Sequence, residues 1–245
     1  MKPIHKLLLF LLSTSAAFVF IGNSYKSDET PVALVKKIIK DVQYKTSEET
    51  DWEIAKTGKP LDDGGEVKTG NRSLALVLFT DGSGLLRVKE NSILHIYGKA
   101  EDRKLNKNTF IQSGTVGFEV NKQEDEEFKF TTPTMVASIR GTDGYIKNNN
   151  SDLSSSECVG TTEFALKTGT AEYQATCGNK ESGSVSGGQA VKFDSKGAGE
   201  KQSWTGEQQS TYDNSQKSDT NKLIIETPEG IFEIEYYPEI EGDQE

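Results

Sequence analysis

The sequence has very little of the chemistry that enzymes use. It contains two histidines, two cysteines and two methionines in 245 residues. A soft metal site needs several cysteine or histidine ligands, and a nucleophile needs a base held beside it. Of the two histidines, only His95 lies outside the N-terminal segment, and it sits within a predicted strand. We therefore predict a protein without catalytic residues, metal or cofactor.

Positive charge is also scarce. Lysine and arginine number 28 against 38 acidic residues, so the formal net charge is −10. Removal of residues 1–24 would take away two lysines and no acid, which leaves −12. Such a surface repels phosphate backbones and anionic lipid head groups. We expect neither nucleic-acid binding nor peripheral membrane binding.

Only one long apolar run is present, Leu7 to Gly22, and it follows a short basic start. This arrangement is typical of an export signal. The small residues Gly22 and Ser24 allow cleavage after Ser24, whereas the bulky end of the run also suits an uncleaved anchor. Its 16 residues are short for a spanning helix, which needs about 20. We expect an exported protein of the periplasm or cell surface, attached to a membrane only through Leu7 to Gly22 if the segment is retained.

The two cysteines, Cys158 and Cys177, would meet a non-reducing environment after export. We predict that they form a disulfide, which would contribute about 3 kcal/mol for a loop of this length. The segment between them reads as a hairpin around Gly169, which would carry both cysteines to one end of a ladder. A metal site or a catalytic thiol is the weaker interpretation, because further ligands or a base are missing.

Alternating apolar residues and glycine turns predict an all-β fold. The stretch from Gly70 to Arg87 contains an apolar strand, the Asp81-Gly82 turn and a returning strand, which is a strong hairpin signal. The strand 74–79 is apolar on both faces, so it needs cover on both sides. We predict an antiparallel sandwich or short solenoid-like layers in two packed β modules, with a C-terminal β-hairpin.

The predicted organisation follows shifts in composition along the chain. Residues 98–108 are taken as a charged connection, and residues 195–221 lack the apolar content needed to offset ordering entropy. The predicted segments are a signal peptide or anchor at 1–24, a β domain at 33–148, a second β module at 149–194, a flexible polar linker at 195–221, a terminal hairpin at 222–237 and an acidic tail at 238–245.

The region from Trp52 to Ile146 resembles the FecR-type domain of bacterial envelope regulators, and the resemblance extends over about Ala33 to Phe193. The matching elements are Trp52, Gly58 with Leu61 and Gly65, Val67-Lys68-Thr69-Gly70, Ala75 to Phe79, Asp81-Gly82-Ser83, Glu90-Asn91-Ser92, Gly114 and Ile139-Arg140-Gly141-Thr142. The resemblance implies an all-β, envelope-located, non-enzymatic domain. Regulators of that family contact a sigma factor through a domain that precedes their membrane helix. Only Met1 to Lys6 precede the apolar run here, so we expect no direct sigma-factor contact.

Several signature residues have a structural and a ligand-binding interpretation. Arg140 ends an apolar strand, where it could pair with Asp143 or Asp81 or contact a ligand. Gly141 beside it implies a bulge or a close backbone approach. Of the two tryptophans, Trp52 is expected in the core and Trp204 as an exposed or anchoring side chain, although both could stack on sugars. The candidate signature set is Trp52, Gly70, Asp81, Gly82, Arg140, Gly141 and Thr142.

These observations favour a non-catalytic module of the cell envelope that serves as an interaction, scaffold or signal-receiving unit. Its expected partner is an envelope protein or polysaccharide. The alternative is an envelope carbohydrate-binding or carbohydrate-active protein, which would need two carboxylates about 5 to 9 Å apart in a cleft if it were a glycosidase.

Overall fold

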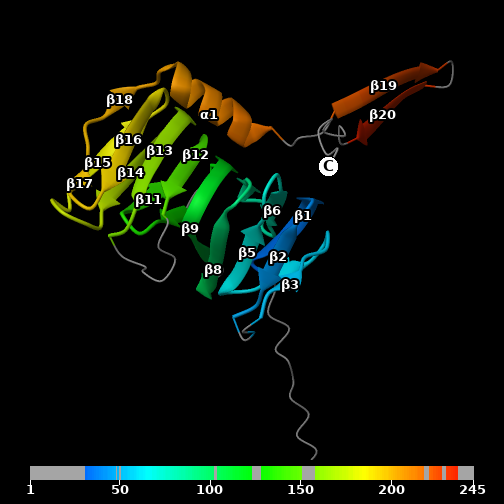
Figure 1. Cartoon of the computed structure of the whole chain (residues 1–245), viewed down its shortest axis with the longest axis horizontal. Coiled ribbons are helices and arrows are strands. Elements are labelled where there is room, and N and C mark those ends of the chain that lie inside the picture. The colour runs from blue at the N-terminus through cyan, green and yellow to red at the C-terminus, as the bar shows by residue number, and fades with distance from the viewer. Residues whose placement is uncertain are drawn as a thin grey trace, which may run out of the picture.

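A computed structural model describes residues 31–47, 49, 51–101, 104–122, 128–150, 158–217, 221–227 and 230–236. These residues form strands and one helix, which confirms the predicted all-β fold (Figure 1). The strands stand in a row from β1 to β17, and the helix α1 (Gly206–Gln216) lies across one side of them. The predicted export signal and acidic tail lie outside the described residues.

The strands are arranged in two layers that share the long strand β9 (Lys104–Val120). Sheet A contains, in spatial order, β4 (Pro60–Leu61), β1 (Ala33–Ile39), β6 (Leu74–Phe79), β7 (Gly84–Val88), the second half of β9, β12 (Thr142–Asn149), β13 (Thr161–Thr168) and β16 (Gln189–Asp194), with the short strands β17 (Gly197–Ala198) and β18 (Gln202–Ser203) on β16.

Sheet B contains, in the same direction, β3 (Glu53–Ile54), β2 (Val42–Lys45), β5 (Gly65–Thr69), β8 (Ile93–Glu101), the first half of β9, β10 (Phe128–Thr131), β11 (Met135–Ile139), β14 (Thr170–Ala175) and β15 (Ser182–Ser186). All these pairs are antiparallel except β9 with β10, which is parallel. The strands of both predicted modules therefore belong to the same two sheets.

The core fills the space between the sheets, because alternate side chains of each strand point inward. Val116, Phe118 and Val120 of β9 are buried there, as are Phe128 and Phe130 of β10. Phe118 and Phe130 pack with ring centroids 4.8 Å apart. The core is continuous from one end of the sandwich to the other.

The chain repeatedly crosses from one sheet to the other at tight corners. Gly141 joins β11 to β12, Gly169 joins β13 to β14, and Gly114 lies where β9 changes sheet. All three have left-handed φ values, of +66°, +82° and +93°. A Cβ on Gly169 would lie 2.6 Å from the carbonyl oxygen of Gly141, so these two corners are in contact. Gly141 was predicted to lie at a bulge or at a close approach of two backbone segments, and the structure has the close approach.

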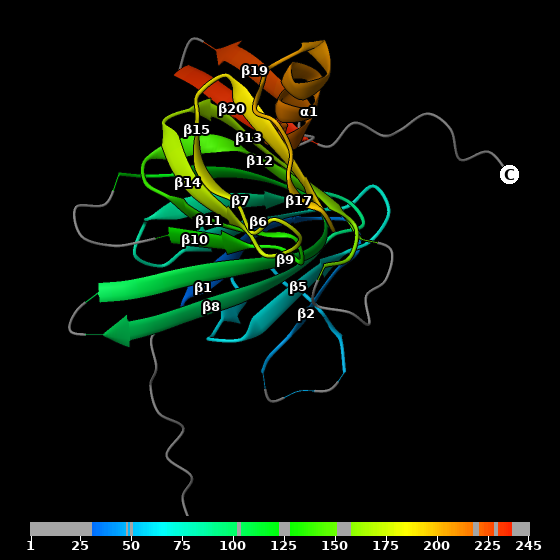
Figure 2. The same cartoon turned by 90° about the vertical axis from the view of Figure 1, so that its left-hand side faces the viewer.

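Three local predictions were wrong. Residues 98–108 are not a connection, because β8 and β9 pair continuously from Gly98 with Lys107 to Glu101 with Lys104. Figure 2 shows this hairpin extending beyond the neighbouring strands. The turn at Gly169 is a corner between sheets rather than a hairpin, because β13 pairs with β12 and β16 while β14 pairs with β11 and β15. The predicted flexible linker at 195–221 was wrong for residues 195–217, because these contain β17, β18 and α1.

The disulfide between Cys158 and Cys177 is present, as predicted, with Cα atoms 5.5 Å apart. It joins the start of β13 in sheet A to the end of β14 in sheet B. Cys158 and Thr176, the residue before Cys177, both bind Pro133, whose carbonyl accepts a hydrogen bond from the backbone N–H of Cys158 at 2.9 Å and from the Thr176 hydroxyl at 3.0 Å. The disulfide therefore holds the two layers together at one end.

The predicted terminal hairpin is also present, as β19 (Asn221–Thr227) and β20 (Gly230–Tyr236). Its two strands pair with each other and with no other strand in the described part of the chain.

Candidate functional site

The outer faces of the two sheets differ. On sheet A, residues 202–217 lie over β12, β13 and the second half of β9. On sheet B, the described part of the chain contains no element packed over the strands from β5 to β15. We call this surface of sheet B the open face. It consists of the outward side chains at Lys45, Glu66, Lys68, Ile93, His95, Tyr97, Asn108, Phe110, Gln112, Lys129, Thr131, Val136, Ser138, Glu172, Gln174, Ser182 and Ser184, together with Trp52.

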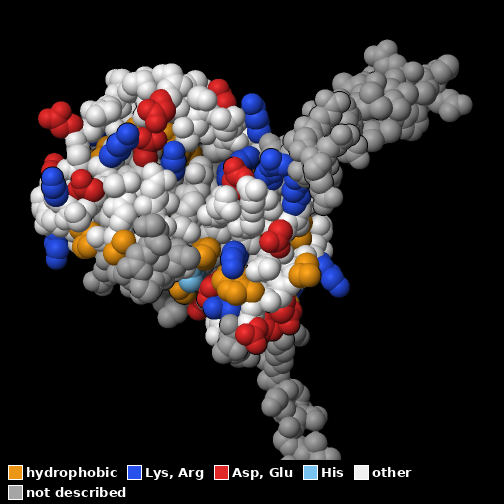
Figure 3. Space-filling view, viewed as in Figure 1, with side chains coloured by type: hydrophobic (Ala, Val, Ile, Leu, Met, Phe, Trp, Pro, Cys, Tyr) orange, Lys and Arg blue, Asp and Glu red, His pale blue; other side chains and the backbone are white. Residues whose placement is uncertain are grey.

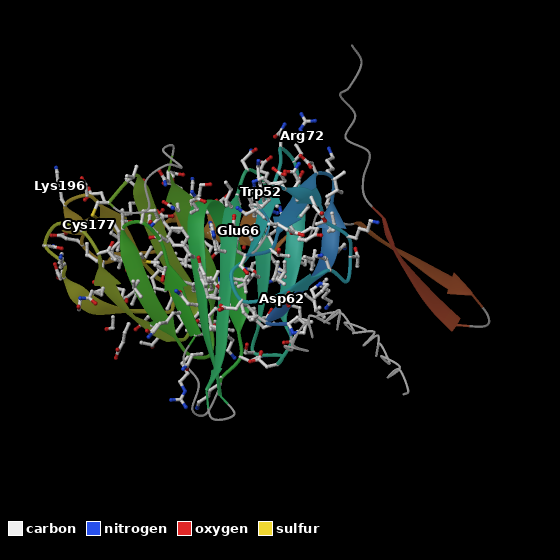
Figure 4. All side chains as sticks on the ribbon, turned by 90° about the horizontal axis from the view of Figure 1, so that it is seen from below. Trp52, Asp62, Glu66, Arg72, Cys177 and Lys196 are labelled. Carbon is white, nitrogen blue, oxygen red and sulfur yellow. A yellow bond between two sulfur atoms is a disulfide. The ribbon has the colours of Figure 1, made fainter. Side chains whose placement is uncertain are left out.

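Trp52 lies at one end of the open face and not in the core. Its side chain is half-buried, and the ammonium groups of Lys45 and Lys68 lie 5.2 and 5.4 Å from its ring. The prediction of a core tryptophan was wrong, because Trp52 precedes the edge strand β3, which covers no interior position. Lys45 also pairs with Glu66 at 3.0 Å, and Figure 4 shows Trp52 and Glu66 beside each other. The indole ring is thus held in place by charged neighbours.

His95 lies in the middle of the open face on β8, packed against its neighbours as predicted. Its Nε2 is 3.0 Å from Oε1 of Gln112, and its Nδ1 is 3.7 Å from the carboxylate of Glu66. Its ring is parallel to that of Tyr97 and contacts the ring of Phe110 edge-on. In Figure 3 this histidine is surrounded by hydrophobic, basic and acidic side chains. Tyr97 is 39% exposed, so one aromatic ring of this group is available to a partner.

A shallow hollow of about 590 Å³ continues the open face over β10, β11, β14 and β15. Its floor follows the register of the sheet, since Lys129 is opposite Ser138, Ser138 opposite Glu172, and Glu172 opposite Ser184. Each of these side chains can form hydrogen bonds, and adjacent strands are about 4.8 Å apart. The hollow therefore offers a regularly spaced row of polar groups.

The outer face of sheet A is covered by a polar helix. Trp204 packs against Tyr145 and Tyr212, with ring centroids 6.3 and 5.4 Å away, and its Nε1 donates to the carbonyl of Gln189 at 3.0 Å. The Tyr212 hydroxyl donates to Asp143 Oδ2 at 2.5 Å. The Tyr145 hydroxyl donates to the carboxylate of buried Glu163. Trp204 is therefore the predicted anchor.

Sequence reasoning missed α1 because its residues form no apolar stripe. The signal that could have found it is a capping box, Thr205-Gly206-Glu207-Gln208. The Thr205 hydroxyl accepts from the backbone of Glu207 at 3.2 Å, and the Gln208 side chain accepts from the Thr205 N–H at 3.0 Å.

Apart from Trp52, the structure places the signature residues at corners and turns away from the open face. Arg140 is exposed beside Gly141, and Thr142 is buried at the start of β12. Of the carboxylates expected near Arg140, Asp81 binds Lys107 and Asp143 binds Tyr212.

Gly70, Asp81 and Gly82 have local structural roles. The Gly70 N–H donates to the carbonyl of Asp41 at 2.9 Å, and a Cβ on Gly70 would lie 2.7 Å from the Asp41 carboxylate. Asp81 accepts from the Ser83 N–H at 2.9 Å, and Gly82 has φ +72°, as the predicted Asp-Gly turn requires.

The described residues contain no group of three or more histidine, cysteine, aspartate or glutamate side chains placed to hold a metal ion. Among the same residues, no helix has the length and hydrophobicity needed to cross a bilayer.

The fold defines a two-layered β module with one covered face and one open face. Residues 65–162 match the family described as FecR protein. Two crystal structures of "a putative anti-sigma factor" from Parabacteroides distasonis are similar, each with 12% identity and a TM-score of 0.46. The similar regions cover 56% of this chain and 59% of each crystallised chain, so this chain spans less than two thirds of their length. None of the curated proteins matches the sequence.

Proposed function

We propose that this protein is a non-catalytic module of the bacterial cell envelope that holds another envelope protein against its open face. The observation that carries the proposal is the difference between the two outer faces. Sheet A uses Trp204, Tyr212 and α1 to cover Tyr145, whereas sheet B leaves aromatic and charged side chains uncovered. Exposed aromatic groups rimmed by polar residues are typical of interaction sites.

The mixture of charges on the open face suits a partner of complementary pattern. Lys45, Lys68 and Lys129 alternate with Glu66 and Glu172 across the sheet. Charge patterns of this kind select partners and orient them during encounter. The Cys158–Cys177 disulfide supports an oxidising location, since such bonds persist outside the cytoplasm.

Site-specific crosslinking in cells tests the proposal. A photoreactive phenylalanine analogue at Val136, on the open face, should capture a protein of defined mass. The same analogue at Lys36, an exposed position on β1 of sheet A, is the matched control. Equal products from both positions, or none from Val136, would contradict the assignment of the open face.

The second candidate is a glycan-binding module, and it rests on the aromatic rings of the open face. Trp52 and Tyr97 present partly exposed rings beside hydrogen-bonding side chains such as Gln112 and Asn108. This combination is suited to sugar rings. Co-sedimentation with purified cell-wall polysaccharide that is lost in Trp52→Ala and Tyr97→Ala, without any protein crosslink at Val136, would favour this candidate.

A further inference from the structure

A cavity of about 490 Å³ lies on the opposite side of the molecule from the open face. It is bounded by β12, β13 and β16, by the segment 194–199 and by the start of α1. The residues that line it are Lys147, Asn149, Thr161, Thr162, Glu163, Lys192, Phe193, Asp194, Lys196, Gly197, Ala198, Gly199 and Glu207. Its volume is within the range of small-molecule sites.

The cavity holds a lysine without a partner. Lys147 is half-buried on β12, and within the described part of the chain it forms no hydrogen bond and no ion pair. An anion that enters the cavity could pair with this ammonium group. Two more lysines, Lys192 and Lys196, are exposed at the rim. The lining thus contains three lysines, and three acidic residues lie in the same lining.

The acidic groups of the cavity do not neutralise Lys147. Glu163 is opposite Lys147 in the register of β12 and β13, but its carboxylate accepts hydrogen bonds from Tyr145 and Gln208 and pairs with Lys192 at 3.3 Å. Asp194 accepts a hydrogen bond from the backbone N–H of Lys196 at 2.7 Å. Glu207 is exposed at the opening. Lys147 therefore has no carboxylate partner among the described residues, in a lining that holds three lysines and three acidic residues.

The rest of the lining consists of hydrogen-bonding groups rather than aromatic surfaces. Thr161 and Asn149 are exposed and supply a hydroxyl and an amide, and residues 197–199 supply backbone groups. The only aromatic residue of the lining, Phe193, is 1% exposed, and its side chain belongs to the core. The cavity therefore has no ring for stacking a nucleobase but many partners for hydroxyl groups.

We propose that this cavity binds an anionic saccharide, a sugar unit that carries a carboxylate or a phosphate. Lys147 binds the anionic group, Lys192 and Lys196 strengthen the attraction from the rim, and Thr161 and Asn149 hydrogen-bond the sugar hydroxyls. This site is separate from the open face and does not depend on the proposed function.

Calorimetric titration of the purified chain with four probes tests the proposal. Glucuronic acid and glucose 6-phosphate distinguish a carboxylate from a phosphate, glucose lacks the charge, and inorganic phosphate lacks the sugar. We expect at least one of the two anionic sugars to bind, with glucose and inorganic phosphate at least tenfold weaker. Raising the salt concentration from 50 to 300 mM should weaken binding severalfold, because the ion pair between Lys147 and the anionic group contributes to the affinity and is screened by salt.

Variants assign the binding to the cavity. Lys147→Met should weaken the anionic sugar at least tenfold, Lys147→Arg should retain most of the affinity, and the matched surface variant Lys36→Met should leave it unchanged. Unfolding midpoints of the three variants show whether each is folded. Binding of glucose as tight as that of glucuronic acid, unchanged affinity in a folded Lys147→Met, or no binding of either anionic sugar at millimolar concentration would overturn the proposal.

Discussion

Lys107 of β9 is fully buried, and its ammonium group pairs with the carboxylate of Asp81 at the β6–β7 turn. Lys107 is beside Phe128 in the register of β9 and β10, and Asp81 is partly exposed. The pair closes this end of the core. A buried ion pair of this kind is sensitive to the loss of one partner, because the remaining charge then loses its counterion in the interior.

The first prediction concerns Asp81→Asn. It should destabilise the fold by about 3 kcal/mol, because it leaves the Lys107 ammonium buried beside a neutral amide. The double variant Asp81→Asn with Lys107→Met should recover most of this loss, since an apolar side chain of similar length replaces the charge. Urea unfolding of the two variants measures both the loss of stability and its recovery. A double variant no more stable than the single one would show that the ion pair is not the cause.

The same ion pair predicts that the free energy of unfolding depends on pH in the acid range. Burial raises the pKa of Asp81, but the hydrogen bonds from Lys107 and Ser83 outweigh it and hold the pKa below its ordinary value. Because the pKa of Asp81 is lower in the folded state, the ionised carboxylate stabilises the fold. This stabilisation is complete above the pKa of the unfolded state, about 3.9, and is lost as the pH falls through the pKa of the folded state. The difference in unfolding free energy between wild type and Asp81→Asn should therefore shrink below about pH 4, in urea titrations at pH 3 and pH 7.

Local strand patterns were predictable from the sequence, whereas the assignment of strands to sheets was not. The Asp81-Gly82 hairpin followed from turn chemistry that acts over four residues. Gly169 has the same kind of turn residue, but there the chain crosses between layers, and only distant partners such as Val191 and Met135 decide the difference. Local glycine signals cannot distinguish a hairpin from a corner.

The burial of Lys107 and the docking of α1 could not be predicted from the local sequence either. Lys107 stands among asparagines and reads as solvent-exposed, yet the parallel pairing of β9 with β10 places it in the core. The helix α1 docks through Trp204 and a few polar contacts, so composition alone made its segment read as a linker. In both cases a long-range contact overrides the local preference.

The Gly141 corner gives the second stability prediction. Gly141→Val should cost about 2 kcal/mol or more, because the residue has φ +66° and an added Cβ would lie 3.1 Å from Cβ of Lys122. Arg140→Ala should cost less than about 0.5 kcal/mol, because Arg140 is exposed. Denaturation curves of both variants test this. An unchanged midpoint for Gly141→Val would contradict the structural role of the corner.

Loss of the disulfide should loosen the β13–β15 end of the sandwich. Replacing Cys158 and Cys177 by serine removes a bond between residues 19 apart, with an expected cost of about 3 kcal/mol. Amide exchange should increase first in β14 and β15, because Cys177 is buried between these strands. Native wild-type protein should show no reactive thiol. Two reactive thiols in that titration, or uniform exchange across the sandwich in the double variant, would contradict this account.

The last prediction concerns the contact between α1 and sheet A. Burial raises the pKa of Asp143, the hydrogen bond from Tyr212 opposes this, and the charge of Glu119 adds to the rise. A raised folded-state pKa means that folding favours the protonated carboxyl, so stability is lost as the pH rises from the unfolded value of about 3.9 through the folded value. Asp143→Asn keeps an acceptor for Tyr212 without the charge. It should therefore raise the unfolding midpoint at pH 7 and leave it nearly unchanged near pH 3.5. Amide exchange of α1 provides the local measurement, with slower exchange expected in the variant at pH 7, and Asp213→Asn on the exposed side of α1 is the matched control. Destabilisation by Asp143→Asn at pH 7 would show that the ionised carboxylate holds the helix in place.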